Sequence, residues 1–149
     1  MKVKYIKFLL LPIIFYVFLA PYKSFGADCD CDYVVKKGEE FLDNDKLKIP
    51  PGSTICFEPD KKGYVKILNF KGTESKPYLF INCGGQVTVG DWKYGIKFVD
   101  CYFFRISGSG DPSIKFGFKI GPTTNEDGIN VTGSDFEIDQ IEIFKTGFA

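Results

Sequence analysis

The sequence predicts an all-β chain that folds as a right-handed parallel β-helix, a solenoid of about four short rungs, each rung being one full turn. The main observation is a near-repeat, in which Tyr78–Cys83 is echoed by Ile96–Cys101. Each copy is followed by a second short run, Val87–Gly90 and Phe104–Ser107. Self-similarity at a short period, with β-branched and aromatic residues and no helical spacing, is typical of stacked strand-turn-strand units.

The near-repeat also predicts a register. If its two copies lie on neighbouring rungs, Phe80 stacks on Phe98 and Asn82 stacks on Asp100. Lys97 must reach water, so the two phenylalanines on the alternate positions are expected to point inward.

Residues 1–27 read as a targeting segment. Lys2, Lys4 and Lys7 precede an apolar run over residues 8–20, and small residues follow at 24–27. This pattern predicts a secretory signal peptide over residues 1–27. An uncleaved membrane anchor is the alternative, but the run is short for a span and contains Pro12. We therefore expect a mature protein that is secreted, periplasmic or on the cell surface, with no membrane span of its own.

Charge and composition exclude several functions for the mature chain. The leader removes four of the 19 basic residues and none of the 19 acidic ones, so the remaining 15 basic and 19 acidic residues give a net charge of −4. A mildly acidic surface predicts no binding to nucleic acid. The sequence contains no histidine, which excludes histidine bases, triads and metal ligands within this chain.

Residues 28–48 carry short apolar pairs in a charged background and are expected to cap the first rung, with a helical turn around Glu39. The rungs are expected to occupy residues 49–149. A turn at Pro51-Gly52 precedes predicted strands at Thr54–Phe57 and Val65–Phe70.

The five cysteines all lie in the mature part, and an odd number leaves at least one free. Export permits disulfides. In neighbouring rungs Cys83 and Cys101 would lie ~4.8 Å apart with parallel side chains, which favours a stacked pair of buried thiols. The preferred disulfide joins Cys56 to Cys31 or to Cys29. Cys29 and Cys31 could also bind a metal ion, but the sequence has no further ligands for them at a zinc-site spacing.

The same pattern extends to the C-terminal part. Ile114–Ile120 predicts a strand of a third rung, and Ile129–Ser134 matches Phe104–Ser109. Phe136–Ile138 and Ile141–Phe144 begin a further turn with strict alternation. The last residues form an apolar strand without a polar cap, so we expect the chain to be the N-terminal piece of a longer protein.

Several stretches resemble the opening rungs of secreted bacterial right-handed parallel β-helix proteins of the pectate-lyase-like superfamily: Ile49–Phe57, Lys76–Gly85, Asp135–Ile143 and Thr146–Ala149. The resemblance covers residues 49–149 and implies the fold, with many more rungs after this segment. It also implies one of the three classes of protein that this superfamily contains: polysaccharide lyases, glycoside hydrolases and non-catalytic surface proteins. No lyase motif of clustered calcium-binding aspartates with an Arg or Lys base is present to carry over.

Acidic residues form the densest candidate site. No Lys or Arg interrupts the set Glu126, Asp127, Asp135, Glu137, Asp139 and Glu142. Three interpretations are open: Ca²⁺ binding through oxygen ligands of Asp135, Glu137 and Asp139, acid-base hydrolysis of a glycosidic bond, or a solvated face that discourages edge pairing.

Aromatic residues form a second candidate site on the turn over residues 90–95. Trp92 and Tyr94 lie there and could stack on a sugar ring, although corner aromatics also pack on neighbouring corners. The sequence thus favours the N-terminal part of an exported β-helix protein that binds or processes polysaccharide, without a complete catalytic set of its own. The alternative is a non-catalytic structural or adhesive module of the cell surface.

Overall fold

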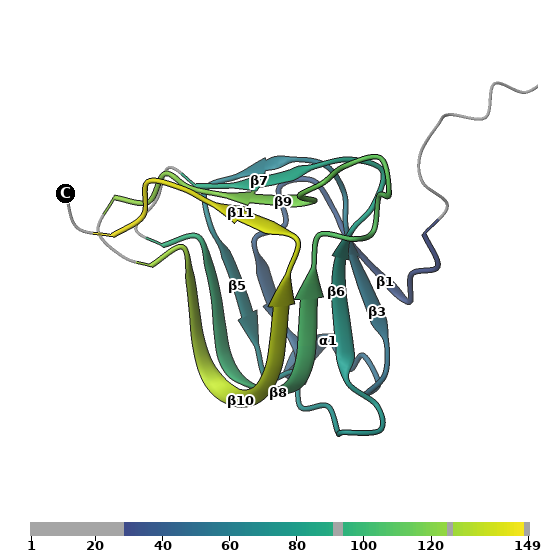
Figure 1. The fold of residues 1–149 in the computed structure, drawn as a ribbon. Helices are drawn as coiled ribbons and strands as arrows, with labels where there is room; N and C mark the ends of the chain where they lie inside the picture. The colour runs from purple at the N-terminus through teal and green to yellow at the C-terminus, as the bar shows by residue number, and fades with distance from the viewer. Residues whose placement is uncertain (1–28, 91–93, 125–126, 148–149) are drawn as a thin grey trace, which may run out of the picture.

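The computed structural model describes residues 29–90, 94–124 and 127–147. These residues form eleven strands and one short helix, α1 (Asn44–Leu47). All pairings between named strands are parallel (Figure 1). The prediction of an all-β chain of parallel strands is confirmed. The helical turn expected around Glu39 lies slightly later in the chain, where Asp43 caps α1 by accepting from the Asp45 N–H at 3.1 Å.

The larger sheet has seven strands in the order β1-β3-β6-β8-β5-β2, with β10 also paired to β8. The strands are β1 (Tyr33–Val35), β2 (Phe41–Asp43), β3 (Thr54–Phe57), β5 (Val65–Leu68), β6 (Tyr78–Asn82), β8 (Ile96–Ser107) and β10 (Ile129–Asp139). The first half of β8 pairs with β5 and the second half pairs with β6. Strand β8 therefore belongs to two stacks of parallel strands at once, and the sheet must curl between them.

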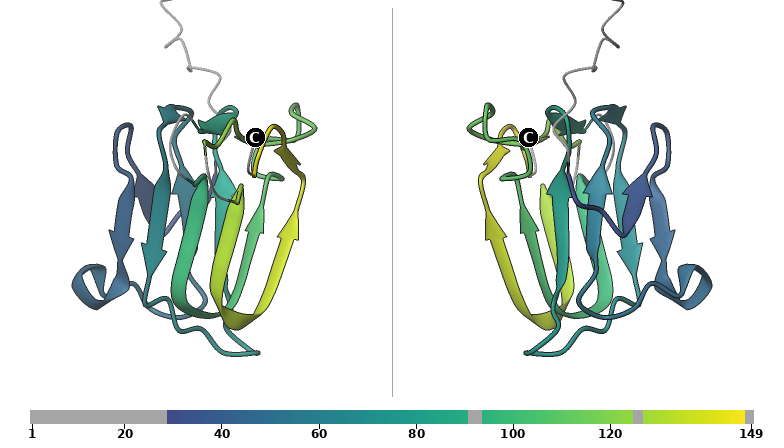
Figure 2. Two further views of the ribbon diagram at one scale, coloured as in Figure 1. Left: turned by 90° about the vertical axis from the view of Figure 1, so that its left-hand side faces the viewer. Right: turned by 90° about the vertical axis from the view of Figure 1, so that its right-hand side faces the viewer.

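The two long strands bend where their backbone leaves the extended region. In β8, Asp100 and Phe103 have φ values of 55° and 48°; in β10, Gly133 and Asp135 have values of 153° and 57°. A side chain at Gly133 would collide with the carbonyl of Cys101, so this corner requires glycine. The result is a pair of U-shaped strands lying side by side (Figures 1 and 2).

The smaller sheet forms a third stack, which lies across the open side of the U in Figure 1. Its order is β11-β9-β7-β4, with strands β4 (Lys61–Lys62), β7 (Val87–Val89), β9 (Phe118–Ile120) and β11 (Ile141–Ile143). Side chains that alternate inward from all three stacks fill the space between them.

The core consists largely of aromatic and β-branched residues from these inward positions. Phe80 and Phe98 are fully buried, as the sequence predicts. The ring of Phe80 lies edge-to-face against those of Phe70, Phe98 and Phe104, with centroids 5.2, 5.7 and 6.1 Å away. Such pairs add to the stability that burial of the rings provides.

The register predicted from the near-repeat is wrong. Phe80 pairs with Ile55 and Ile106 on its two sides, and Phe98 pairs with Ile67 and Val131. The near-repeat compares β6 with the first half of β8, which belong to different stacks. Inward and outward side chains alternate in every strand of such a structure. The pattern therefore does not show whether one rung contains two strands or three.

Two later matches fail for the same reason. Ile129–Thr132 pairs with Ile96–Val99 rather than with Phe104–Ser109. The strand expected at Ile114–Ile120 forms over Phe118–Ile120, and it pairs with β7 rather than with Ile96–Asp100, the stretch that it resembles in sequence. Of the other predictions, the signal peptide, Trp92 and Glu126 lie outside the described residues. The described part contains no helix long and apolar enough to cross a membrane.

A buried lysine lies where the third stack begins. Lys62 is 1% exposed. It occupies the inward position of β4 that corresponds, strand by strand, to Val89 of β7, Ile120 of β9 and Ile143 of β11. Its ammonium group donates to the carbonyls of Lys36 and Glu39 at 3.2 and 3.0 Å, and lies 3.4 Å from the Asp60 carboxylate. Because the charge is paired and hydrogen-bonded, this lysine can replace an apolar residue at the end of the core.

Candidate functional site

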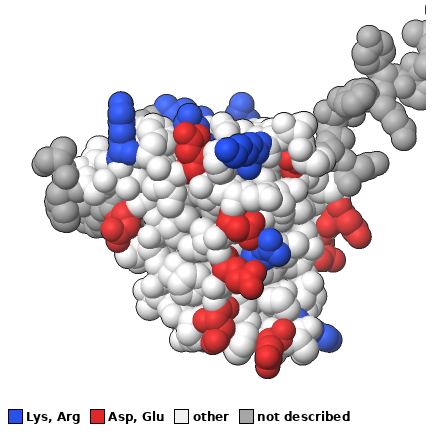
Figure 3. Space-filling model, viewed as in Figure 1, with Lys and Arg blue, Asp and Glu red and all other residues white. Residues whose placement is uncertain are grey.

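The acidic run of β10 receives its counter-charge from β8. The two strands pair so that Glu137 lies beside Arg105 and Asp139 beside Ser107. The Arg105 Nε is 2.6 Å from Asp139 Oδ2 and 3.7 Å from Glu137 Oε2, and the Ser107 hydroxyl donates to Asp139 Oδ1. Figure 3 shows the acidic groups on this side of the molecule with a basic group between them.

These contacts change the protonation equilibria of the site. Burial by itself raises the pKa of the Asp139 carboxyl, but hydrogen bonds from Arg105 and Ser107 outweigh it, so the pKa lies below its usual value. The hydrogen bond to Asp139 raises the pKa of Arg105 in turn. The pair is therefore ionised throughout the physiological range, which makes Asp139 a positioning group for Arg105 rather than a proton donor.

A groove of about 470 Å³ lies next to this pair, at the corner where β8 and β10 bend. Its walls come from three segments, namely the loop before β6, the bend of β8 and the bend of β10. They carry three carboxylates, one guanidinium group and aromatic rings; the lining residues are Glu74, Pro77, Phe103, Phe104, Arg105, Asp135, Phe136 and Glu137. Phe103 and Asp135, both with left-handed φ values, face each other across neighbouring strands at the bend. Left-handed backbone is uncommon for phenylalanine, whereas aspartate adopts it more readily.

The structure distributes the predicted calcium ligands differently. Asp135 and Glu137 line the groove, whereas Asp139 is held by Arg105 and Ser107. Within residues 29–90, 94–124 and 127–147, the carboxylates of these three residues do not converge into a group with metal-ligand spacing. Calcium binding here stays a prediction.

The other predicted residues lie apart from the groove lining. Glu142 lies 3.6 Å from Lys119, and Asp127 accepts from the Asn130 side chain at 3.2 Å. Tyr94 packs edge-to-face on Tyr64, with ring centroids 5.5 Å apart. This is the corner-on-corner packing that the sequence left open as the alternative to sugar contact.

Sequence reasoning missed Arg105, Phe103 and Glu74 as site residues. Arg105 is far in the chain from its strand partner Glu137, and only the true register brings them together. A basic residue at the outward position of a predicted strand is the one signal that was present. Phe103 and Glu74 come from a bend and a loop, for which the sequence offers no periodic signal.

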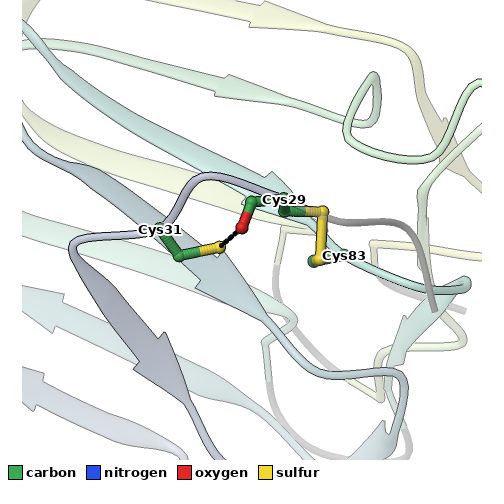
Figure 4. A group of neighbouring side chains, drawn as sticks. All are labelled: Cys29, Cys31 and Cys83. Atoms are coloured by element: carbon green, nitrogen blue, oxygen red, sulfur yellow. Dashed lines mark hydrogen bonds between the residues drawn. A yellow bond between two sulfur atoms is a disulfide. The ribbon is translucent and has the colours of Figure 1, made fainter. Parts of the chain in front are cut away.

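A cluster of cysteines forms a second site, where Cys29 and Cys31 at the start of the described chain lie close to Cys83 (Figure 4). Cys31 is joined to Cys56 and Cys29 is joined to Cys83, with Cα–Cα distances of 5.8 and 6.0 Å. The sulfurs of Cys29, Cys31 and Cys83 lie within 4.8 Å of one another. The Cys31 sulfur is also 3.3 Å from the Cys29 carbonyl oxygen. The two disulfides together fix the N-terminal segment to the sheet.

The expected pair of stacked thiols at Cys83 and Cys101 is wrong, because it depended on the register of the near-repeat. Cys83 is in a disulfide, and Cys101 is the free cysteine of the described chain. Cys101 is fully buried, and burial raises the pKa of its thiol. Because the thiolate is the reactive form, we expect this cysteine to be inert in the folded protein.

Acid should destabilise the fold through a defined set of carboxyl groups. Hydrogen bonds or nearby cations lower the folded-state pKa of Asp43, Glu58, Asp60, Asp100, Asp111 and Asp139. The stability that these groups contribute is fully present above the unfolded-state pKa of about 4 and is lost as pH falls through the lower folded-state values. We expect the thermal unfolding midpoint to be flat from pH 7 to about 5 and to fall below about pH 4. A midpoint that stays constant down to pH 2 would contradict this assignment, and Asp139→Asn should reduce the slope.

Comparison of the chain with protein-family models, with curated proteins and with solved structures found no match in any of the three. The likeness to the pectate-lyase-like superfamily thus depends on the sequence stretches alone, and the argument for function comes from the fold and the groove.

Proposed function

We propose that the chain is a right-handed parallel β-helix of four rungs. The order of the strands supports this proposal. The chain passes through the three stacks in the same sequence each time: β2, β3, β4, then β5, β6, β7, then the two halves of β8 and β9, then the two halves of β10 and β11. Connections between parallel strands of one sheet are right-handed in about 98% of known cases, which favours the right-handed form.

We propose further that this is the N-terminal part of an exported protein that binds or processes polysaccharide, and that the groove between β8 and β10 is its glycan site. The observation that carries the proposal is the combination of charged and aromatic groups around one open volume of about 470 Å³. Carboxylates and a guanidinium group can hydrogen-bond sugar hydroxyls, while exposed aromatic faces pack on the apolar side of a pyranose ring. Phe136, 43% exposed and stacked on Phe104, offers such a face.

The disulfides support the exported location, because such bonds persist in oxidising compartments. We therefore propose that the mature protein is in the periplasm, at the cell surface or in the medium, and the leader sequence supports the same proposal.

The charges of the groove predict which sugars it prefers. Glu74, Asp135 and Glu137 face the volume, and the charge of Arg105 is already neutralised by Asp139. A polyuronate would bring further carboxylates into an acidic groove and would be repelled. Neutral sugars and amino sugars are therefore the expected ligands.

A glycan array of neutral, amino and uronate oligosaccharides, followed by calorimetry on the best ligand, tests this. We expect binding to neutral or amino sugars at micromolar to millimolar Kd, and a loss of at least about tenfold, or ~1.4 kcal/mol, in Arg105→Ala. Lys119→Ala is the matched control, because Lys119 is a comparably exposed cation that pairs with Glu142 outside the groove. Preference for uronates, or equal affinity in the two variants, would refute the assignment of the groove.

A structural or adhesive surface module is the second candidate. Its support is that Asp139 and Glu137 both pair with the guanidinium group of Arg105, an arrangement that suits a structural role rather than proton transfer. An array without any bound glycan, together with no lyase or hydrolase activity on polysaccharides, would favour this candidate.

A further inference from the structure

The two disulfides lie next to each other, although their cysteines come from distant parts of the sequence. Cys29 and Cys31 precede β1, Cys56 lies in β3, and Cys83 directly follows β6. These three strands are neighbours in the larger sheet. The Cys83 N–H donates to the carbonyl of Phe57 at 3.0 Å, so Cys83 lies beside the residues that follow Cys56. The fold therefore brings four sulfurs together, three of which are drawn in Figure 4.

The sulfurs are close enough to share one metal ion. Those of Cys29, Cys31 and Cys83 lie within 4.8 Å of one another, and that of Cys56 is bonded to that of Cys31. In a tetrahedral site with Zn–S distances of about 2.3 Å, the sulfurs lie about 3.8 Å apart. Once the disulfides are opened, the bonded sulfurs can separate to that distance by side-chain rotation, because their Cα atoms are already 6.0 and 5.8 Å apart.

The ligand atoms select the class of ion. The sequence contains no histidine, and no carboxylate of the described chain joins this group. The ligand set is therefore sulfur alone. Thiolates select soft and borderline ions such as Cu⁺ and Zn²⁺, whereas Ca²⁺ and Mg²⁺ require oxygen ligands. Four thiolates are one of the closed ligand sets of structural zinc sites.

Burial of the sulfurs allows both access and protection. Cys29, Cys31 and Cys83 are half-buried, so a reductant and an ion can reach them, whereas Cys56 is fully buried. Cys101 is separate from this group. It is fully buried at the bend of β8, where its sulfur lies 3.5 Å from the carbonyl oxygen of Ile67. Cys101 therefore serves as the matched control for a cysteine outside the cluster.

We propose that this cluster binds one soft cation of the Zn²⁺ type when its disulfides are reduced, with Cys29, Cys31, Cys56 and Cys83 as the ligands. Each disulfide takes up two electrons and two protons from one molecule of an external dithiol, which itself becomes a disulfide. The four thiols release their protons as the ion binds. The disulfide form and the metal form use the same sulfurs and exclude each other. This proposal does not depend on the nature of the glycan.

The metal form replaces the cross-links that reduction removes. In either form residues 29–31 are joined to β3 and to the end of β6, so the N-terminal segment stays fixed to the sheet. Because an ion that binds only the folded chain stabilises it, Zn²⁺ should restore stability to the reduced protein.

Metal titration of the reduced protein tests the proposal. The Cys101→Ser variant, which retains four cysteines, is reduced with a dithiol, freed of the dithiol without air and titrated with Co²⁺ and then with Zn²⁺. We expect one ion per chain, with a sulfur-to-metal charge-transfer band for Co²⁺ that Zn²⁺ abolishes. The oxidised protein is the control and should bind neither ion at this site. A stoichiometry other than one, or a Co²⁺ spectrum without this band, would overturn the proposal.

Variants identify the ligands. In the Cys101→Ser background, Cys83→Ser should weaken Zn²⁺ binding at least about a hundredfold, because loss of a group outside the ligand shell already costs 10–100-fold. Cys101→Ser alone should bind Zn²⁺ as tightly as the unchanged protein. Equal affinities with and without Cys83 would refute the site.

Thermal unfolding separates binding by the folded protein from binding by the unfolded chain. Zn²⁺ should raise the unfolding midpoint of the reduced Cys101→Ser variant, and circular dichroism should match that of the oxidised protein. Reduction in the presence of Zn²⁺ gives the same readout if the metal-free reduced chain does not fold. A midpoint that Zn²⁺ leaves unchanged or lowers, or loss of β-structure on reduction with Zn²⁺ present, would contradict the proposal.

Discussion

Replacement of Cys31 and Cys56 by serine should lower the free energy of unfolding by about 3.5 kcal/mol. The disulfide closes a loop with a sequence separation of 25, and a cross-link of that size destabilises the unfolded chain by about 3.5 kcal/mol through lost chain entropy. For the bond between Cys29 and Cys83, with a separation of 54, the expected loss is about 4 kcal/mol. Urea unfolding of the oxidised protein, monitored by circular dichroism, measures both.

Cys101→Ser is the control for this experiment. It changes a cysteine that takes part in no disulfide, so unfolding with and without reductant should differ by the same amount as in the unchanged protein. Thiol titration of the unchanged protein without reductant should find no reactive cysteine in the native state and one, Cys101, after denaturation. Two or more reactive thiols in the native state, or equal stability of the oxidised and reduced forms, would contradict the pairing.

Replacement of Lys62 by alanine should destabilise the protein by about 3–5 kcal/mol, the range for loss of one partner from a buried ion pair. The change leaves two carbonyl oxygens and the Asp60 carboxylate without their cation, and it removes the apolar stem of the lysine from the core. The Asp60 side chain is only 8% exposed, so water cannot replace the ammonium group fully. Denaturant unfolding at pH 7 gives the value.

Lys62→Met separates charge from packing in that experiment, because methionine keeps most of the apolar volume. It should still cost about 2–3 kcal/mol, from unsatisfied buried polar groups. Adding Asp60→Asn to Lys62→Met should recover part of the loss, and the double-mutant cycle gives the interaction energy between the two residues. A loss below about 0.5 kcal/mol in Lys62→Ala, well under the range for a buried pair, would mean that the ammonium group contributes nothing net.

Local pattern was enough to predict most of the strands after residue 53 and the inward positions of Phe80 and Phe98, but it did not predict β4 or the pairing of β1 and β2 with the sheet. Phe80 and Phe98 alternate with polar or exposed positions, and this period of two depends only on neighbours in sequence. Register depends on which distant strands meet, and alternating apolar runs of similar length fit several partners equally well. The wrong register therefore left each strand nearly correct while it assigned the wrong neighbour to Phe80.

The prediction of the candidate site was affected both by the correct local pattern and by the wrong register. Asp135 and Glu137 were identified because acidic residues without a Lys or Arg between them stand out in sequence, and both line the groove. Arg105 was missed because its contact with Glu137 exists only in the correct register, and the pairing of Cys83 with Cys29 was missed for the same reason. Lys62 was missed because a lysine next to another lysine gives no indication of burial.

If the protein is exported as we propose, the positions of the disulfides have a consequence for the order in which it folds. All four bonded cysteines precede residue 84, so both bonds join segments that leave a translocation channel before β8 does. Domains fold from the N-terminus as the chain emerges, and a solenoid extends from any unit that is already formed. Oxidation of the first segments would thus provide a covalently closed platform on which β8 and β10 assemble one after the other. The late segments, which complete the groove that we propose as a glycan site, would then fold only in a compartment that has already formed those bonds.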